Sequence, residues 1–460
     1  MALIKSISGT RGTIGGAVGT NLTPFDVVEA AAAYGTWLKE NHTPVKVVVG
    51  RDGRISGEMV SQLAIQTLIA LGIDVVDLGW STTPTVAMIA PREKAQGGII
   101  FTASHNPKQW NALKFLNAKG EFISKADGQT ILEIASNQSI EFAPVEKLGT
   151  VSQAEDAIDW HIQEILKLDL VDVEAIKAKA FKVVVDCINS TGAIAMPPLL
   201  EALGCTYELL NGEVTGRFAH NPEPLPENLN ELSREVLFHK AHLGIAVDPD
   251  VDRLAFVCED GEMFGEEYTL VAVSDYVLQH EKSDTVSNLS STRALRDVTE
   301  KHGQTHHASA VGEVNVVTKM KEVGAKIGGE GNGGIIYPAL HAGRDAMVGV
   351  ALMLSHLAKF NKPISFLRSQ YPEYVISKNK IQLTPEINLD LIFKKLSKKY
   401  QAQPQNDVDG LKIEFDSDWI HLRKSNTEPI IRIYAEANSE VMANNLAEKI
   451  KSDISEIIKD

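Results

Sequence analysis

The sequence predicts an α/β protein with three similar α/β domains, each built on a mixed sheet, followed by a smaller α+β domain. Two observations predict this architecture. A chain of 460 residues is too long for a single hydrophobic core. Helix-like and strand-like segments alternate along most of the chain, and this pattern changes only toward the C-terminal end. The expected domains are residues 1–155, 156–258, 259–370 and 371–460.

The first domain opens with a clear helix signal. Thr23 suits an N-cap, Pro24 suits the first helical position, and Asp26 lies near the positive end of the helix dipole. The Ala-rich stretch that follows continues the helix to Lys39. Apolar runs and turn residues then alternate, which predicts a buried strand at 45–49, a helix at 57–71 and a strand at 74–78.

A strand followed by a polar loop recurs along the chain. Each case is a short apolar run that leads into a loop rich in Gly, Asp or Ser. No direct sequence repeat is visible, but the recurrence favours three successive α/β units of broadly similar architecture. The strand-and-loop pairs are 98–101 with 102–107, 181–185 with 186–192, 244–247 with 248–253, and 325–327 with 328–334.

The last domain has a different pattern. A stretch containing Pro and Gln at 401–407 lies among strand-like segments. These features together predict a small, separate α+β domain. A terminal amphipathic helix closes it, because four apolar residues recur every four positions and fall on one face: Leu446, Ile450, Ile454 and Ile458.

Composition and charge exclude several classes of protein. With 44% hydrophobic and 23% charged residues the chain is typical of globular proteins. A net charge of -15 argues against nucleic acid or an anionic membrane as the main partner, whereas a small anionic substrate responds only to the local field of a cleft. No apolar run approaches the ~18 residues of a membrane helix, and the N-terminus does not read as a signal peptide. Three cysteines without metal-ligand spacing, Cys187, Cys205 and Cys258, fit a cytoplasmic location.

Ser104 is the candidate for the residue that carries the reaction. It lies in residues 101–107, which read Phe-Thr-Ala-Ser-His-Asn-Pro and follow an apolar run. A hydroxyl on a tight turn beyond a strand end is where α/β sheets place their chemistry. A hydrolase-like pairing with His105 is not expected, because adjacent side chains on extended backbone point apart and no Gly-x-Ser-x-Gly elbow exists.

Three aspartates, Asp248, Asp250 and Asp252, alternate directly after another apolar run. Carboxylates this close repel one another unless a cation lies among them, and hard oxygen ligands suit Mg²⁺ or Ca²⁺. An EF-hand is rejected, because Arg253 occupies the position that needs Gly and a strand-like run follows. A solvated acidic turn is the alternative. Mg²⁺ on these carboxylates and a substrate phosphate oxygen fits better, and Arg253 could clamp that phosphate.

A basic loop near the C-terminal end predicts a phosphate site. In an extended segment, Arg423, Ser425 and Thr427 share a face. A phosphate dianion suits such an array together with backbone N–H groups of a loop. A polar surface turn is the alternative. The donors are Arg423, Lys424, Ser425, Asn426 and Thr427, with Arg432 just beyond.

Two further loops carry weaker signals. The Gly-rich loop 328–334 lets the backbone approach a ligand, and Glu330 and Asn332 would offer an acceptor and an amide to sugar hydroxyls. It is neither a Walker loop nor a dinucleotide fingerprint, and an ordinary tight turn is the alternative. Residues 8–12, Ser-Gly-Thr-Arg-Gly, are similar to an anion-binding turn around Arg11. The histidines at 306–307 are expected to be polar residues on the surface.

In this order and over nearly the whole chain, the four main loops resemble those of the α-D-phosphohexomutase family. The resemblance implies four domains around a central cleft, each contributing one loop. Residues 102–107 are similar to the family's phosphoserine loop, 248–253 to its metal loop, 329–334 to its sugar-binding loop and 423–432 to its phosphate-binding loop.

The resemblance also implies a role for each candidate residue. Ser104 would be carried as phosphoserine, with Mg²⁺ on its phosphate and on the three aspartates. Lys114, ten residues after the serine, holds the position of a residue that assists proton transfer. The expected catalytic residues are Ser104, His105, Lys114, Arg253 and Arg11, and the expected substrate-binding residues are Glu330, Gly331, Asn332, Arg344, Arg423, Ser425, Asn426, Thr427 and Arg432.

By the same resemblance, the expected activity is that of an isomerase. Phosphoserine would give its phosphoryl group to the free hydroxyl of a hexose 1- or 6-phosphate. The resulting hexose bisphosphate would turn over in the cleft and return its other phosphate. The expected cofactors are Mg²⁺ and a hexose bisphosphate activator, and the expected partner is a small sugar phosphate, with no nucleic acid and no membrane. A monomer or a homodimer would serve this role.

The sequence departs from the family pattern at two places. Many members have Ser and His in the sugar loop, as Gly-Glu-x-Ser-Gly-His, where this chain has Asn332 and Gly334. His341, Arg344 and Asp345 are candidates to fill the gap. The second departure is Ala at position 112, where Gly is common, and it leaves Lys114 in place.

The altered sugar loop resembles the archaeal-type branch, much of which is assigned to glucosamine phosphate. The favoured reaction is therefore glucosamine 6-phosphate to glucosamine 1-phosphate for amino-sugar nucleotide synthesis. A phosphoglucomutase or phosphomannomutase is the alternative. A sugar-phosphate-binding protein without activity, or a phosphatase, is disfavoured because Ser104, Lys114 and the three aspartates are all present.

Overall fold

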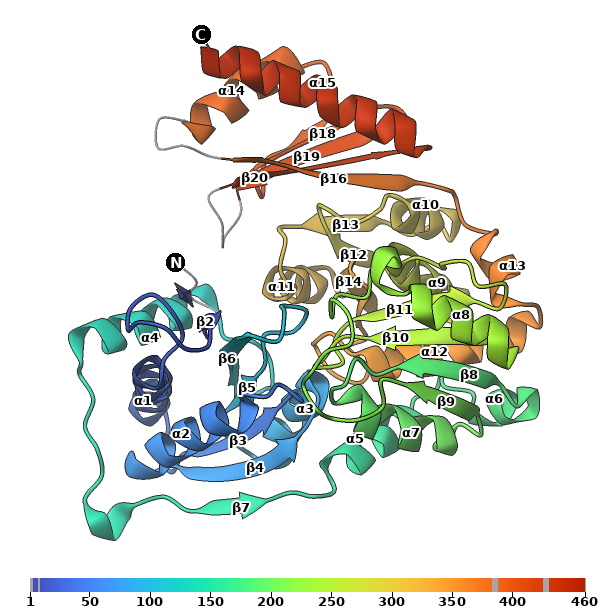
Figure 1. Ribbon diagram of the computed structural model, residues 1–460. Helices are drawn as coiled ribbons and strands as arrows, with labels where there is room; N and C mark the ends of the chain where they lie inside the picture. Colours follow the sequence, from blue (N-terminus) through green and yellow to red (C-terminus); the bar gives the residue numbers. More distant parts are fainter. Residues whose placement is uncertain (1–2, 7–8, 383–387, 425–429, 460) are drawn as a thin grey trace. The chain divides into compact units, whose positions relative to one another are not determined.

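The computed structural model describes residues 3–6, 9–382, 388–424 and 430–459. The chain forms two compact units, of which the first comprises residues 1–280 and 332–368 and the second comprises 281–331 and 369–460. The polypeptide therefore crosses from one unit to the other three times. Figure 1 shows the elements coloured along the sequence.

The first unit contains a seven-stranded mixed sheet in the order β1-β2-β6-β5-β3-β4-β7. Strands β3, β4, β5 and β7 run parallel, whereas β6, β2 and β1 are joined by antiparallel pairs. The strands are β1 (Ile4–Ser6), β2 (Gly9–Thr13), β3 (Lys46–Arg51), β4 (Asp74–Trp80), β5 (Gly97–Phe101), β6 (Trp110–Asn117) and β7 (Val151–Gln153). The accompanying helices are α1 (Pro24–Asn41), α2 (Gly57–Ala70), α3 (Thr83–Arg92) and α4 (Lys125–Asn137), and a 3-10 turn covers Val145–Lys147.

Both faces of this sheet are covered, which explains why its central strands read as unbroken apolar runs. Val47 and Val49 pack into the core shared with α1, α2 and α4. Val48 points to the opposite face and packs with α3. All five residues of β5 are buried, and the strand delivers the chain at Phe101 into the loop that contains Ser104.

The second sheet of the first unit has four strands in the order β11-β10-β8-β9. Strands β8, β9 and β10 are parallel and β11 is antiparallel to β10, so this sheet is also mixed. All residues of β10 are buried, and the strand ends at Val247, directly before Asp248. The strands are β8 (Lys182–Asp186), β9 (Thr206–Leu210), β10 (Leu243–Val247) and β11 (Leu254–Cys258). The helices are α5 (Ala157–Leu166), α6 (Val173–Lys179), α7 (Gly192–Ala202) and α8 (Asn230–His239), and a 3-10 turn covers Pro226–Asn228.

Helix α12 (Ala346–Phe360) completes the first unit, although it lies far along the chain. Residues 346–358 are all buried, and the helix packs against α6 and α9. A helix apolar on every side is one that a core surrounds. The other elements of this part are α9 (Glu266–His280), β15 (Gly334–Ile336) and α13 (Ile364–Arg368).

The second unit holds two groups of strands. In the first, β12 pairs in parallel with β13 and β14. The second is an antiparallel sheet in the order β16-β20-β19-β18-β17, with α14 and α15 against it (Figure 1). The first group contains β12 (Thr285–Asn288), α10 (Ala294–Lys301), β13 (His306–Ser309), α11 (Glu313–Val323) and β14 (Ile327–Glu330). The second contains β16 (Val375–Gln382), α14 (Leu389–Lys399), β17 (Gln405–Asn406), β18 (Leu411–Glu414), β19 (Trp419–Lys424), β20 (Ile430–Ala437) and α15 (Glu440–Lys459).

The predicted fold class is confirmed, and most predicted elements lie within two residues of their observed bounds. The predicted N-cap of α1 is also confirmed, since Thr23 and Asp26 form a capping box. The predicted apolar face of α15 is confirmed at Ile450 and Ile454, which are buried. The prediction is wrong at Ile458, which is 45% exposed in the last turn. Among the described residues, no helix is both long enough and apolar enough to cross a membrane. The domain boundaries stay predictions.

Candidate functional site

Ser104 lies on a tight turn immediately after β5, as predicted. Its backbone is left-handed, with φ 48°, a conformation that is uncommon for a residue with a Cβ. The turn is held by two local bonds. The Ser104 amide donates to Thr102 Oγ1 at 2.9 Å, and the Asn106 amide donates to the carbonyl of Ala103 at 3.0 Å. Ser104 is only 3% exposed, so a group attached to its hydroxyl would be largely shielded from bulk water.

His105 lies closer to the serine than the sequence predicted. Its Nδ1 is 3.4 Å from Ser104 Oγ, whereas adjacent side chains were expected to point apart. The expectation assumed an extended backbone at this position, but the backbone of Ser104 is left-handed. The hydroxyl proton nevertheless goes elsewhere, because Ser104 Oγ donates to Asp248 Oδ2 at 2.6 Å. Burial and four nearby cations hold the pKa of His105 well below its usual value.

The three aspartates after β10 form one cluster, in which one oxygen from each lies within 4.8 Å of the others. All three are completely buried. The loop folds back on its first member, since Asp248 Oδ1 accepts from the amides of Asp252 and Arg253 at 3.0 and 3.1 Å. The remaining oxygen of Asp248 accepts from Ser104, so the serine and the acidic cluster form one site.

The donor set fits a divalent cation. Among the described residues, Asp250 Oδ1 and Asp252 Oδ1 are buried side-chain atoms without a hydrogen-bond partner. Burial and the two neighbouring carboxylates raise the pKa of Asp248 well above its usual value. Burial acts in the same direction on Asp250, but Lys114 and Thr83 outweigh it, and its pKa is lowered. Carboxylates this close cannot all be charged unless a cation offsets them, and Mg²⁺ takes such oxygen ligands.

Four cations surround this cluster. Lys114, on β6, donates to Asp250 Oδ2 at 3.1 Å, and Arg344 donates to Asp252 Oδ2 at 2.7 Å. Arg11, on β2, donates to Asn106 Oδ1 at 3.0 Å, and burial lowers its pKa. Arg253 donates to Glu223 Oε1 at 2.9 Å. Its Nε has no partner within the part of the chain that is described. All four lower the pKa of His105, so their fields converge on the serine turn.

The predicted sugar-loop residues have local partners of their own. Glu330, the last residue of β14, accepts from Asn288 at 2.8 Å and from the Gly312 amide at 3.1 Å. The Gly331 amide donates to Ser291 at 2.9 Å. Asn332 belongs to the first unit, where its Oδ1 accepts from the Gly334 amide at 3.2 Å.

Two of the residues proposed to replace the missing sugar-loop histidine form a pair in the first unit. Asp345 is completely buried and caps α12 by accepting from the Met347 and Val348 amides. Its Oδ2 lies 2.9 Å from His161 Nε2 and 3.3 Å from His341 Nε2. Asp345 is therefore engaged inside the unit.

The predicted phosphate loop is described only at its two ends. Ser425, Asn426 and Thr427 lie outside the described residues. Arg423 and Arg432 are among the described residues, and they lie directly opposite each other on the antiparallel strands β19 and β20. Two like charges opposed across a sheet cost stability unless an anion or carboxylate compensates.

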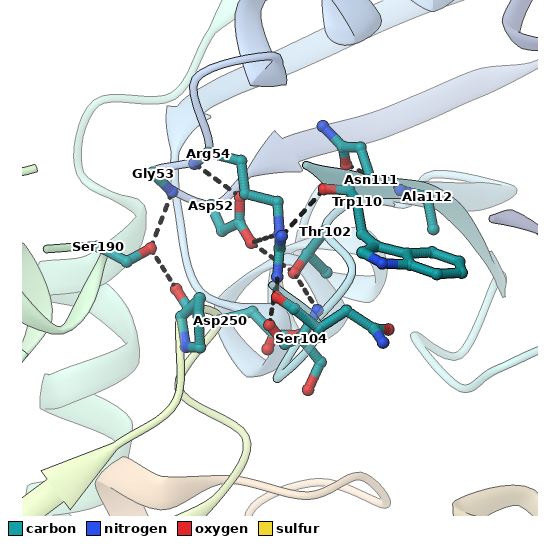
Figure 2. Close-up of polar contacts among 12 residues, drawn as sticks. Asp52, Gly53, Arg54, Thr102, Ser104, Trp110, Asn111, Ala112, Ser190 and Asp250 are labelled. Atoms are coloured by element: carbon teal, nitrogen blue, oxygen red, sulfur yellow. Dashed lines mark hydrogen bonds and ion pairs between the residues drawn. The ribbon is translucent and has the colours of Figure 1, made fainter. Parts of the chain in front are cut away.

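Several residues with a part in this site were not singled out from the sequence. Thr83 donates to Asp250 Oδ2 at 2.6 Å, and Glu223 holds Arg253. Arg54 donates to four carbonyls of the Ser104 turn and its surroundings (Figure 2). The available signal for Arg54 was its position directly after a buried strand, in a loop at the same sheet edge as Ser104.

Four family models match the chain. They describe phosphoglucomutase/phosphomannomutase alpha/beta/alpha domain I at residues 5–141, domain II at 159–261, domain III at 265–374 and the C-terminal domain at 386–452. A crystal structure of a phosphoglucomutase/phosphomannomutase family protein from Burkholderia thailandensis superposes with a TM-score of 0.83 at 26% identity, covering 99% of this chain and 97% of that one.

Full-length archaeal proteins are also similar in sequence. A phosphoglucomutase/phosphomannomutase of Thermococcus kodakarensis is 35% identical, over 95% of this chain and 96% of its own length. A probable phosphoglucosamine mutase of Methanopyrus kandleri is 33% identical, over 96% of each chain. A phosphoglucosamine/phosphogalactosamine mutase of Sulfurisphaera tokodaii is 33% identical, over 96% of this chain and 98% of its own length.

Proposed function

Because the chain belongs to the phosphoglucomutase/phosphomannomutase family, the α-D-phosphohexomutases, we propose that it interconverts hexose 6-phosphate and hexose 1-phosphate through a phosphoserine at Ser104. Glucosamine phosphate is the proposed substrate, and the product would supply amino-sugar nucleotide synthesis. Glucose or mannose phosphate is the alternative, since a relative of comparable identity carries the phosphoglucomutase/phosphomannomutase name.

One observation carries the proposal. Ser104 Oγ donates directly to Asp248, a member of a buried triple-aspartate cluster with two unpaired carboxylate oxygens among the described residues. In a typical hydrolytic site a histidine takes the proton of the serine. Here Ser104 Oγ donates its proton to a carboxylate of the acidic cluster instead. This arrangement suits a serine that carries a phosphoryl group beside a cation.

Phosphoryl transfer is proposed to occur in two steps. The O–P bond of phosphoserine breaks as the free hydroxyl of the bound hexose phosphate forms a new O–P bond, and that hydroxyl's proton passes through a basic group to the released Ser104 Oγ. The hexose bisphosphate then returns its other phosphoryl group to Ser104 Oγ, whose proton goes to the released sugar oxygen. Lys114, paired with Asp250, is the proposed participant in proton movement.

The acidic cluster and the surrounding cations share the charge of the reacting group. Asp248, Asp250 and Asp252 would hold Mg²⁺, which when bound offsets negative charge on the transferring phosphoryl group. Arg253 and Arg11 supply fixed positive charge on the protein side. The low exposure of Ser104 limits access of water, and water would otherwise hydrolyse the phosphoserine.

The other phosphate of the substrate is proposed to bind at residues 423–432. The support is the pair Arg423 and Arg432, two guanidinium groups opposed across neighbouring strands. An anion held between them could accept hydrogen bonds from both guanidinium groups.

The proposal is tested by intact mass and turnover together. Purified protein incubated with glucose 1,6-bisphosphate should gain one phosphate, and Ser104→Ala should lose both the adduct and turnover. Ser61→Ala is the matched control, because Ser61 is also a buried serine, and its hydroxyl donates to the Glu58 carbonyl within its own helix. Absence of the adduct together with no turnover of any hexose phosphate would reject the mutase.

Substrate choice needs a separate experiment. Turnover of glucosamine, galactosamine, glucose and mannose phosphates should be compared on one preparation, with the same bisphosphate activator. A higher kcat/KM for glucosamine phosphate than for the other sugars is expected. A preference for glucose or mannose phosphate would leave the mutase intact and overturn the amino-sugar assignment.

A further inference from the structure

Arg54, beside the Ser104 turn, is only 1% exposed. An arginine has five N–H donors, and all five find acceptors here. Its Nε donates to Asp52 Oδ2 at 3.0 Å. The other four bonds go to main-chain carbonyls of the serine turn and the chain beyond it (Figure 2): Pro107 at 2.8 Å, Trp110 at 2.9 Å, Asn106 at 2.7 Å and Ser104 at 2.5 Å.

Asp52 holds the same turn from the other side. Besides its pairing with Arg54, its Oδ2 accepts from Thr102 Oγ1 at 2.6 Å. Thr102 Oγ1 in turn accepts from the Ser104 amide at 2.9 Å. The Ser104 peptide is therefore fixed at both ends, its amide through Thr102 and Asp52, and its carbonyl through Arg54.

This double support matters because the backbone of Ser104 is strained. A residue with a Cβ at φ 48° is less stable than in its ordinary conformations, and such a conformation persists only where its surroundings impose it. In the observed conformation Ser104 Oγ meets Asp248. A turn that relaxed to a right-handed or extended φ would direct the hydroxyl elsewhere.

The loop that carries Arg54 is also tied to the metal loop. The Gly53 amide donates to Ser190 Oγ at 2.9 Å (Figure 2). Ser190 Oγ in turn donates to the Pro249 carbonyl at 2.7 Å. A Cβ at position 53 would lie 2.9 Å from Ser190 Cα, so only glycine allows this approach. One short loop thus contacts both partners of the proposed chemistry.

We infer that Arg54 and Asp52 are positioning residues for phosphoryl transfer, which hold the Ser104 turn in its left-handed conformation so that its hydroxyl faces the acidic cluster. This inference rests on the proposed function. Neither side chain contacts the Ser104 hydroxyl, and both act through the backbone of the turn. Lysine cannot replace Arg54, since a single ammonium has three donors and no planar fork to reach carbonyls on two sides.

The test compares Arg54→Lys with Arg51→Lys. Arg51 ends the preceding strand, and its guanidinium lies 5.3 Å from the centre of the Trp80 ring rather than on the serine turn, so it is a matched control. The first readout is hydrogen exchange of residues 102–110. The second is the single-turnover rate at which glucose 1,6-bisphosphate phosphorylates Ser104, followed by intact mass.

We expect Arg54→Lys to lose exchange protection selectively at 102–110. Phosphorylation of Ser104 should be at least about 100-fold slower, because displacing a reacting group by about 1 Å lowers the rate by about this factor. The KM should change less than about threefold. Arg51→Lys should retain both properties. A rate within about threefold of the control, or loss of protection spread evenly over the first unit, would overturn the inference.

A second variant covers the case in which Arg54→Lys does not fold. Thr102→Val keeps the shape of the side chain but removes the link between Asp52 and the Ser104 amide, and it should slow phosphorylation by about tenfold. An unchanged rate in this variant would count against the inference. If wild-type protein neither accepts phosphate nor turns over any hexose phosphate, the proposed function fails, and the exchange readout alone then decides whether Arg54 holds the turn.

Discussion

His421, on β19, gives a prediction for the stability of the second unit. The ring is buried with an exposed fraction of 1%. Its Nε2 donates to the Asp409 carbonyl at 2.7 Å, and its Nδ1 accepts from Ser290 Oγ at 2.9 Å, so the neutral ring satisfies both nitrogens. Burial, and behind it the positive charges of Lys412 and Arg423, lowers the pKa to about 4, although the bond to the Asp409 carbonyl and the Asp409 charge oppose the shift.

The sign and size of the effect follow from proton linkage. In the unfolded chain this histidine has its ordinary pKa of 6.5 and takes up a proton as the pH falls, while the folded ring does not until about pH 4. The folded state therefore loses stability through this window. Between about pH 7.5 and about pH 5, the two pKa values give a loss of about 2 kcal/mol.

The assay is denaturant unfolding of wild type and His421→Gln, each near pH 7.5 and near pH 5, with the exposed His42→Gln as control. The variant cannot be protonated, so its stability should fall by about 2 kcal/mol less than that of the wild type over the same interval. An equal fall in both proteins would refute the reasoning. So would an NMR titration in which the folded His421 ring is protonated above pH 6.

Three further predictions concern the first unit. Gly97→Ala on β5 should destabilise this unit by about 1–3 kcal/mol, because a Cβ there would lie 1.9 Å from the Tyr34 hydroxyl. A melting temperature equal to that of the wild type would contradict this prediction. Glu223→Gln should lower kcat/KM by about tenfold, since the charge that holds Arg253 is lost, and the exposed Glu227→Gln should not. Mg²⁺ at about 100 times its Kd should stabilise the folded protein by about 2.7 kcal/mol relative to chelator, and identical melting curves with and without the metal would exclude a metal site in the acidic cluster.

The alternation of strands and polar loops was enough to predict where the chemistry gathers. Asp248, Asp250 and Asp252 follow a buried strand, and Ser104 follows another, so the sheet edges could be read from the sequence. Their meeting across the first unit, in the Ser104–Asp248 bond, was available only through a family resemblance, since the residues are 144 positions apart.

Other features were missed or predicted wrongly from the sequence. The geometry of His105 was predicted wrongly because it depends on a left-handed φ at Ser104, and a serine rarely adopts one without external support. The role of Arg54 was missed because its acceptors are main-chain carbonyls, which every residue possesses. Ile458 continues the apolar repeat of α15 but lies in its last turn, where it is 45% exposed.

The late position of α12 in the chain has a consequence for biosynthesis. Its buried residues belong to the first unit, yet they follow residue 280 only after the segment 281–331 has been made. At the usual pace of about 5–20 residues per second, the ribosome needs roughly 4–16 s to travel from residue 280 to residue 360, the last residue of α12. Throughout that interval, the apolar surfaces of α6 and α9 that α12 will cover are exposed to solvent. The emerging segment 281–331 also lacks residues 369–460, with which it forms the second unit. The nascent chain therefore passes through a defined window in which chaperone binding or aggregation competes with folding, and the window closes once α12 leaves the exit tunnel.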